Sequence, residues 1–386
     1  MPATSQWIAS IGETVRPMLG DLHVLSRIGL AQMYIPADQQ FAYTIRGHRS
    51  AVGPRLTRSG QSVRYSAICA LGIAAGGSDL AEEILGPGGL DSLVAKTTTE
   101  ALQPGRDPGS IALAAWAAAE VSGDIDQALL AALATLPIDP TISVVELSWV
   151  VTAAVAACRV GADAESVMRS AVGRLIGRQG AGGLFAPYVD PSRGLRVRRH
   201  VGSFADQVYP IQALARAADT LGEPGWLERA GVTASAICAL QGDSGQWWWH
   251  YDSRARRVVE SYPVYSVHQH AMGPMALRDL AEVGGHQYAD AAVAGLRWLE
   301  SHPETMVPMI EKDLGVVWRK VGRREPRKLT RALAALYTSV DPRRQLPTGV
   351  LALFPPRLID YECRPYELGW LLYAWRGFLG VERGLR

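Results

Sequence analysis

Histidine and tyrosine side chains that could transfer protons lie close together late in this chain of 386 residues. Tyr265 and His268 are three residues apart, a spacing that places both side chains on one face of a helix. A tyrosine and a histidine held in this way can act as general acid and base near neutral pH. We therefore predict that Tyr265 and His268 are catalytic; the alternative is a hydrogen-bonded pair in the core.

Three acidic residues are candidates for the partner of this pair. Asp206 follows Ser203 by three residues, which is also the spacing of a residue that caps the start of a helix. Glu146 is the one acid in a long apolar segment, so its carboxylate needs either a cationic partner such as Arg64 or an opening into a cavity. We favour the cavity. Glu367, near the start of the last apolar segment, completes the predicted catalytic set.

Aromatic and cationic residues that could hold a ligand cluster in the later half of the chain. The stretch QGDSGQWWWHYD (241–252) contains three consecutive tryptophans, on which the C–H faces of sugar rings can stack. The segments 190–200 and 252–260 are rich in arginine, which binds carboxylate or phosphate through paired hydrogen bonds. The predicted substrate-binding residues are Trp248, Trp249, Tyr251, His250, Arg64, Tyr65, Tyr209, His270, Arg198 and Arg199.

Metal and nucleotide chemistry find no matching pattern in the sequence. His268 and His270 are two residues apart, whereas two zinc-binding histidines on one helix are four apart. Neither GxGxxG nor GxxxxGK[ST] occurs as a phosphate-binding loop, and there is no GxSxG nucleophile motif. We therefore expect no metal ion and no cofactor.

Paired helices are expected to position these residues. Ala- and Leu-rich segments with helical spacing recur along the chain, whereas the alternating pattern of strands is scarce. Apolar segments end in short glycine turns, after which a more amphipathic segment begins. The predicted pairs are 62–75 with 79–96, 108–121 with 124–135, 142–160 with 163–177, 203–221 with 224–240, 263–283 with 287–302, and 364–380 with either 5–19 or 327–338.

Six such hairpins predict an all-α fold, an (α/α)6 toroid. First helices that are apolar on nearly every side would form the inner layer, and one-sided second helices the outer layer. An open solenoid is the alternative. We expect a single domain over 1–386, with long loops at 22–61, 178–202, 241–262 and 303–363 on one rim, where the candidate residues meet. Pro210 and Pro274 should each bend an inner helix and free a backbone carbonyl.

Composition argues against several classes of partner. A formal net charge of +2 gives no overall reason to expect nucleic acid or a membrane surface. The four cysteines are scattered without CxxC pairing, as in a reducing compartment. The N-terminal residues lack the pattern of a signal peptide, and no segment has 18 uninterrupted apolar residues. We expect a cytoplasmic protein without an integral membrane segment.

Two of the glycine turns resemble the QW motif of squalene and oxidosqualene cyclases and of prenyltransferase-like toroids. CALQGDSGQW (238–247) ends a helix in glutamine, followed by glycine and tryptophan, and RLIGRQGAGGLF (174–185) is a second copy that ends in phenylalanine. The resemblance implies that the glutamine caps a helix end and that the aromatic ring packs on the next hairpin. The DxDD acid of class II cyclases is absent.

A further resemblance concerns the substrate. The segments 203–216 and 245–277 resemble uncharacterised proteins of bacterial polysaccharide gene clusters, which implies a carbohydrate. The sequence thus predicts an enzyme that acts on an anionic sugar or oligosaccharide by acid/base chemistry, as a lyase, epimerase or hydrolase. Inverting hydrolysis would need two carboxylates, such as Asp206 and Glu367, about 6.5–9.5 Å apart. The alternatives are a terpene cyclase-like enzyme with an acid outside DxDD, and a binding toroid without catalysis.

Overall fold

A closed ring of six inner helices forms the centre of the molecule in this computed structural model, which describes residues 7, 9, 11, 13–50, 53–263, 266–302 and 305–378. Each inner helix contacts the next, and the last contacts the first. The predicted toroid is therefore confirmed, and the open solenoid is excluded. In order around the ring, the inner helices are α3 (Val63–Gly76), α6 (Pro108–Ala117), α8 (Val144–Arg159), α10 (Ala205–Leu221), α12 (Gly273–Glu282) and α16 (Pro365–Ala374).

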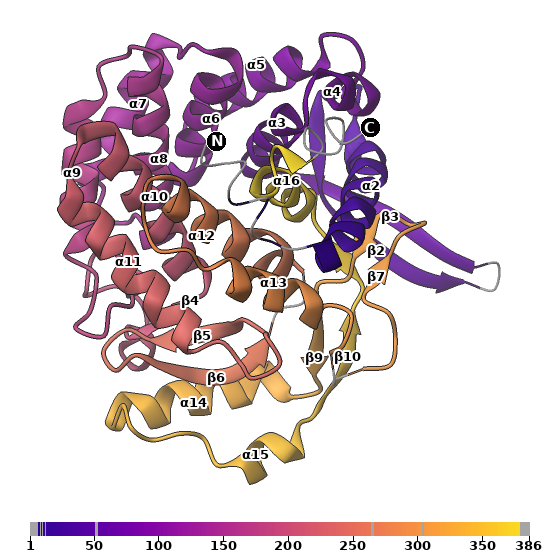
Figure 1. The fold of residues 1–386 in the computed structure, drawn as a ribbon, viewed down its shortest axis with the longest axis vertical. Coiled ribbons are helices and arrows are strands. Elements are labelled where there is room, and N and C mark those ends of the chain that lie inside the picture. The colour runs from indigo at the N-terminus through magenta and orange to yellow at the C-terminus, as the bar shows by residue number, and fades with distance from the viewer. Residues whose placement is uncertain are drawn as a thin grey trace.

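A second layer of helices covers the ring from outside (Figure 1). The apolar residues of α9 that are buried recur every three to four positions, from Val167 to Leu175, so this helix has one dry face. In contrast, α6 has no polar face and is buried almost throughout. The outer partners are α4 (Ser78–Leu85) and α5 (Gly89–Ala101) for α3, then α7 (Gln127–Thr135), α9 (Glu165–Ile176), α11 (Pro224–Ala239), α13 (Ala289–Trp298) and, for α16, α2 (Arg16–Met33).

The sixth hairpin differs from its prediction. Its outer helix is α2, which covers 16–33 and packs on α16, so the loop expected from residue 22 starts only after this helix. The other expected partner, 327–338, forms α14 (Leu329–Val340), which packs on strand β6 instead. Helix α2, near the N-terminus, thus pairs with α16, near the C-terminus, and completes the sixth hairpin.

Close backbone approach joins α16 to α3 at two glycines. A Cβ atom on Gly72 would overlap the carbonyl oxygen of Gly369, and one on Gly369 would lie 3.0 Å from the carbonyl oxygen of Ile68. Only residues without a side chain allow two helices to pack this closely. The seam where the ring closes therefore depends on both glycines.

The glycine turns between paired helices are confirmed by their backbone. A glycine with φ between +67° and +95° follows each of the first five inner helices, at Gly77, Gly123, Gly161, Gly222 and Gly284. The helix predicted over 79–96 is interrupted, since Gly86 and Gly88 also take positive φ and separate α4 from α5.

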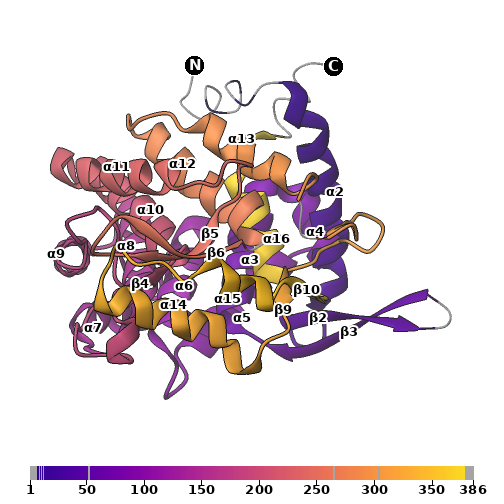
Figure 2. The ribbon, with the colours of Figure 1, turned by 90° about the horizontal axis from the view of Figure 1, so that it is seen from below.

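The long rim connections contain strands, which the sequence pattern did not indicate. One sheet has the order β1-β2-β11, with β3 also paired to β2; a second has the order β4-β5-β6, and two further pairs are β9 with β10 and β7 with β8. The β2–β3 hairpin projects from the body (Figures 1 and 2). Bounds are β1 (Tyr34–Ile35), β2 (Gln40–Ser50), β3 (Gly53–Gln61), β4 (Val201–Ser203), β5 (Trp248–Asp252), β6 (Arg257–Pro263), β7 (Ile310–Glu311), β8 (Val316–Val317), β9 (Lys320–Arg323), β10 (Pro356–Asp360) and β11 (Glu362–Cys363); a short helix, α15 (Thr348–Leu353), precedes β10.

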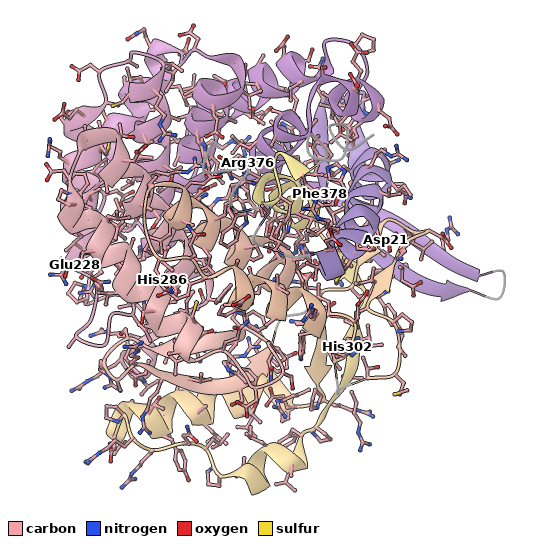
Figure 3. All side chains as sticks on the ribbon, in the orientation of Figure 1. Asp21, Glu228, His286, His302, Arg376 and Phe378 are labelled. Atoms are coloured by element: carbon pink, nitrogen blue, oxygen red, sulfur yellow. The ribbon has the colours of Figure 1, made fainter. Side chains whose placement is uncertain are left out.

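A buried ionic network closes the far end of the ring, at the C-terminal ends of the inner helices. Arg216 of α10 lies 2.7 Å from Asp279 of α12 and donates to the hydroxyl of Tyr373 on α16. Glu120, which follows α6, pairs with Arg216 at 3.2 Å. Arg376, labelled just beyond α16 in Figure 3, bonds the second oxygen of Asp279 at 2.6 Å. Four inner helices are thus tied together at this end.

Among the described residues, no helix is both long and apolar enough to span a membrane.

Candidate active site

A cavity of about 270 Å³ lies at the opposite end of the ring, where inner helices begin. The helices α3, α8, α10 and α16 each contribute a residue of their first turns to its wall. Helix N-termini carry partial positive charge, so their convergence favours an anionic ligand. The polar and aromatic wall residues are Tyr65, Trp149, Tyr209, Trp249, Tyr366, His268, Arg64 and Arg319.

Arg64 forms one wall and is held by two acids. Its guanidinium pairs with Glu146 and with Asp107, and it lies 5.5 Å from the centroid of the Trp149 ring. Glu146 also accepts bonds from the backbone and hydroxyl of Ser143 at 3.0 and 2.8 Å. Our preference for a Glu146 side chain that faces the cavity is therefore wrong: its carboxylate caps α8 and orients the arginine.

Arg319 forms the second cationic wall and was missed by the sequence analysis. It lies between β8 and β9, in the segment 303–363 that the sequence predicted to be a rim loop. Its place in the cavity wall depends on contacts with acids that are distant in the chain, so no local pattern indicated it. Its guanidinium donates to Glu362 at 3.1 Å and lies 3.7 Å from Glu367. Burial raises the pKa of the Glu367 carboxyl to about 7, although Arg319 and Arg364 oppose this shift. Glu367 is fully buried behind Tyr366 and is not itself a wall residue.

His268 reaches the cavity from a π-helical segment, η5 (His268–Met272), that leads into α12. Pro274 has no N–H to donate to the carbonyl of His270, and Trp375 bonds that carbonyl instead at 2.7 Å. The structure thus confirms the expectation that Pro274 frees a backbone carbonyl, which is that of His270. Burial, with Arg319 nearby, lowers the pKa of His268 to about 3, so its ring is neutral at neutral pH.

The three consecutive tryptophans have three different positions. Trp247 is fully buried, and its backbone N–H donates to the side-chain oxygen of Gln269 at 3.0 Å. Trp248 is half-buried and is not part of the cavity wall. Trp249 is part of that wall, with the guanidinium of Arg331 4.1 Å from its ring centroid. Of the predicted platforms, only Trp249 reaches the cavity.

Both glutamines of the QW-like turns bond the next outer helix. Gln241 donates to the carbonyl of Gly245 at 2.6 Å and to that of Ala291 in α13 at 2.9 Å. Gln179 donates in the same way to the carbonyls of Gly183 and of Arg229 in α11, at 3.3 and 3.0 Å. These glutamines therefore join neighbouring hairpins, and their contribution is structural.

Asp206 acts at the start of α10, as its spacing from Ser203 allowed. Its carboxylate accepts from the backbone N–H and the hydroxyl of Ser203, at 2.6 and 2.7 Å. Burial raises its pKa to about 6 despite these bonds. The carboxylate is not among the wall residues of the cavity, whereas its neighbour Ala205 is.

Several other predicted residues lie away from the cavity. Tyr251 and His270 are fully buried, and His250, with a pKa lowered by burial to about 4, lies 3.5 Å from Glu260. Arg198 donates to the carbonyl of Arg331, and Arg199 is exposed on the outer surface. The prediction that these five residues contact one central ligand is not supported by their positions. Tyr265 lies outside the described residues.

A larger polar groove of about 790 Å³ adjoins the cavity, with Arg64 as the wall residue common to both. Tyr43 lines the groove and stacks on Tyr65 with ring centroids 5.2 Å apart. Tyr65 in turn lies 4.5 Å from Tyr366. Three tyrosines thus form a continuous aromatic path from the groove into the cavity.

Metal binding has no site within the described ranges, because no three His, Cys, Asp or Glu side chains gather there in a way that could hold an ion.

The fold is an α/α toroid, and three solved structures with this fold are similar over nearly the whole chain. An unsaturated glucuronyl hydrolase from Bacillus sp. GL1 is 15% identical, with a TM-score of 0.55 over 95% of this chain and 96% of its own. Cellobiose 2-epimerase from Bacillus thermoamylovorans B4167 is 10% identical, with a TM-score of 0.57 over 92% and 95%. A polysaccharide lyase is 11% identical, with a TM-score of 0.55 over 94% and 98%. No protein-family model and no curated protein matches the chain.

Proposed function

We propose that this protein is a carbohydrate-active enzyme that transfers a proton at the carbon beside the carboxylate of an acidic sugar. The observation that carries the proposal is the wall of the central cavity, where five aromatic rings surround two guanidinium groups and a neutral histidine. Elimination and epimerisation both begin with this proton transfer.

Recognition of a sugar follows from the shape and the composition of the wall. A volume of about 270 Å³ is below the range of about 300–1000 Å³ that holds drug-sized ligands, so the cavity suits a single sugar ring. The rings of Trp249 and Tyr65 offer surfaces on which its C–H face can stack. Arg64 and Arg319 can each bind a carboxylate, and the converging helix N-termini support the same charge.

The chemical step requires a base that is free of protons at neutral pH. His268 lies in the wall with an unprotonated ring, which can take the proton from the carbon. Its lowered pKa makes it a weak base, so the step depends on an arginine that stabilises the negative charge moving onto the carboxylate. In an epimerisation, a wall tyrosine on the opposite face returns a proton to the same carbon. In an elimination, the electron pair expels the neighbouring oxygen substituent, which takes a proton from a tyrosine.

Three wall tyrosines could donate this proton. Burial raises the pKa of Tyr65 to about 12 and also raises the pKa of Tyr209 and Tyr366, so all three hydroxyls stay protonated at neutral pH. Tyr265, the donor predicted from the sequence, stays a prediction.

The similar structures support a sugar substrate by the names they carry. The hydrolase from Bacillus sp. GL1 is described as responsible for the degradation of glycosaminoglycan, and the other two are an epimerase of cellobiose and a polysaccharide lyase. Two of these names, a lyase and an epimerase, match the two reaction classes proposed here, although cellobiose itself is a neutral sugar. The terpene cyclase-like alternative fits the wall less well, because two guanidinium groups and a histidine interrupt its apolar surface.

The test uses oligosaccharides of glucuronate, galacturonate and mannuronate, with neutral glucose oligosaccharides for comparison. The reaction is run in deuterated water and followed by proton NMR, which detects exchange at the acidic carbon, and by the ultraviolet absorbance of unsaturated uronates. We expect one acidic series to react and the neutral series to remain unchanged.

Variants of two histidines distinguish a loss of catalysis from a loss of folded protein. His268→Gln should lower the rate by about a hundredfold or more, the contribution typical of a general base. His286→Gln is the control, because His286 is exposed on the outer layer of helices (Figure 3). Equal rates for His268→Gln and the parent protein would contradict the proposal.

Hydrolysis is the second candidate, because Glu367 follows the wall residue Tyr366 and has the raised pKa of a general acid; this reaction requires its buried carboxylate to turn into the cavity. In that case a neutral or acidic glycoside would release a reducing sugar without exchange of a carbon-bound proton. Glu367→Gln would then abolish the release, whereas His268→Gln would reduce it only modestly. A toroid that binds sugar without catalysis would show neither exchange nor release.

A further inference from the structure

A second cleft, of about 460 Å³, lies on the outside of the rim and is lined mainly by cations. We call it the arginine cleft; its polar residues are Arg178, Arg196, Arg199, His200, Ser253, Arg254 and Ser339. We propose that the arginine cleft is an accessory site that binds acidic groups of an oligosaccharide whose end occupies the central cavity. The choice of a saccharide as the ligand rests on the proposed function.

Positive charge in the arginine cleft is largely uncompensated. Arg178 donates to the backbone carbonyl of Tyr188 at 2.9 Å and Arg199 to that of Gly194 at 3.4 Å, and a carbonyl does not neutralise a guanidinium. Arg196 is exposed. Within the described part of the chain, none of the cleft residues is acidic. An anion bound there would therefore gain favourable interactions with several guanidinium groups.

Two acids lie near the arginine cleft and affect it differently. Asp190 lies on the same loop as Arg199. Hydrogen bonds from Ser192 have the largest lowering effect on the pKa of its carboxyl, and Arg193 and Arg199 have a smaller one. Asp252 is fully buried and holds Arg254 through both carboxylate oxygens, at 3.1 and 2.9 Å. Arg254 is thus partly neutralised, and the net charge of the cleft comes from the other three arginines.

The base of the arginine cleft is a fixed structure. Arg254 also donates to the carbonyl of Thr338 at 2.6 Å, and the imidazole of His200 lies 2.8 Å from the hydroxyl of Thr338. The backbone N–H of Ser253 donates to the carbonyl of His200 at 2.9 Å. Because these bonds set Arg254 in place before a ligand arrives, binding does not have to order that side chain.

A chain of contacts connects the arginine cleft with the central cavity. Arg198, which lies between two cleft arginines in the sequence, donates to the carbonyl of Arg331 at 3.3 Å. The guanidinium of Arg331 lies over Trp249, which is part of the cavity wall. The cleft is also a local pocket on a protein of net charge +2, whereas nucleic acid binding uses an extended basic stripe. The charge of the cleft therefore matches an acidic oligosaccharide better than nucleic acid.

The test measures binding of hexagalacturonate to the full chain by calorimetry, with maltohexaose and inorganic phosphate as comparison ligands. The double variant Arg196→Gln/Arg199→Gln should raise the dissociation constant for hexagalacturonate by about tenfold or more and weaken its dependence on salt. Arg343→Gln, a change of an arginine that is 85% exposed outside the cleft, is the control and should bind as the parent does. Galacturonate monomer should bind the double variant and the parent equally.

A cavity variant separates this inference from the proposed function. Trp249→Ala should keep a weaker, salt-sensitive binding of hexagalacturonate, which disappears when the two arginine changes are added. If the double variant binds as the parent does while Trp249→Ala abolishes binding, the arginine cleft is not a binding site. The proposed sugar site in the central cavity is then still supported. If Trp249→Ala has no effect and the double variant abolishes binding, the cleft stands and the proposed function fails. Binding of phosphate alone, without hexagalacturonate, would overturn the saccharide as the ligand.

Discussion

His268 and His270 are two residues apart but lie in different surroundings. His268 reaches the cavity, whereas His270 is fully buried, and neither of its ring nitrogens has a hydrogen-bond partner within the described residues. Burial lowers the pKa of His270 to about 3. A buried imidazole without hydrogen bonds lowers the unfolding free energy, so His270 destabilises the fold. It is not a second site residue.

The substitution His270→Leu should therefore stabilise the protein, most of all in acid. Below the unfolded pKa of about 6.5, the unfolded chain binds a proton that the buried ring of the folded state does not. The unfolding free energy of the parent should thus fall as the pH decreases from 6.5 towards 3. The variant should gain about 1 kcal/mol at neutral pH and about 3 kcal/mol more at pH 4.5. Urea unfolding at both pH values measures this difference; equal pH dependence in both proteins would contradict it.

Five of the predicted site residues line the cavity, because starts of inner helices and rim segments meet at one end of a ring: Arg64, Tyr65, Tyr209, Trp249 and His268. The spacing of Asp206 from Ser203 indicated its role as a helix cap, whereas the same spacing of Glu146 from Ser143 was overlooked. The pairing of Glu146 with Arg64 joins residues 82 apart, and that of Arg319 with Glu362 joins residues 43 apart. Such pairs depend on the closed ring and leave no local pattern to find.

Glycine has a second use in this fold besides the turns between helices. Gly72 and Gly369 allow α3 and α16 to approach each other where the ring closes. In contrast, Gly173 in the middle of α9 has no atom within 4 Å of the position where a Cβ would lie. The same substitution should therefore have opposite effects at the two sites.

We predict that Gly72→Ala lowers the unfolding free energy by several kcal/mol, since the new methyl group forces two backbones apart. Overpacking of this kind costs about 1–3 kcal/mol even where only side chains must move. Gly173→Ala should raise the unfolding free energy by about 0.5–1 kcal/mol, because alanine favours the helix. Thermal unfolding of both variants measures the two effects. An unchanged unfolding free energy for Gly72→Ala would contradict the prediction, because the seam would then have room for a methyl group.

Helices and their order could be predicted because periodicity and glycine turns are local signals. The short rim strands β4, β7, β8 and β11 could not, since two or three residues carry no alternating pattern and these strands exist through their partners. The long strands β2 and β3 were missed as well, because their segment was assigned to a loop. The partner of α16 was left open between an N-terminal segment and 327–338, and the N-terminal segment was given as 5–19 where the structure has α2 at 16–33, because this pairing joins the two ends of the described chain. These are the parts of the fold in which distant residues decide the local structure.

At the scale of the whole molecule, the ring is closed at one end and hollow at the other. In the network at the closed end, Arg216, Asp279 and Tyr373 are buried, and Glu120 lies at its solvent-exposed edge. Arg216 and Arg376 hold the pKa of Asp279 well below its usual range against the effect of burial. Each charge has a partner, so the network is stable only while it is complete.

Removal of one member should therefore destabilise the whole ring. Arg216→Met leaves Asp279 with less compensation and should lower the unfolding free energy by about 3–5 kcal/mol. The control is Arg159→Met, which breaks an exposed pair with Asp219 and should cost at most about 1 kcal/mol. Urea denaturation of the two variants tests this contrast, and similar losses in both would show that the network contributes no more than a surface ion pair.

The central claim is that the hollow end binds one acidic sugar ring, and a crystal structure of the full chain with glucuronate tests it most directly. We predict that the sugar occupies the central cavity, stacked on Trp249 or Tyr65, with its carboxylate bonded to Arg64 or Arg319 and a ring carbon next to His268. Glucose should leave the cavity empty under the same conditions. Glucuronate bound only outside the ring, or a carboxylate that points away from both arginines, would contradict the account.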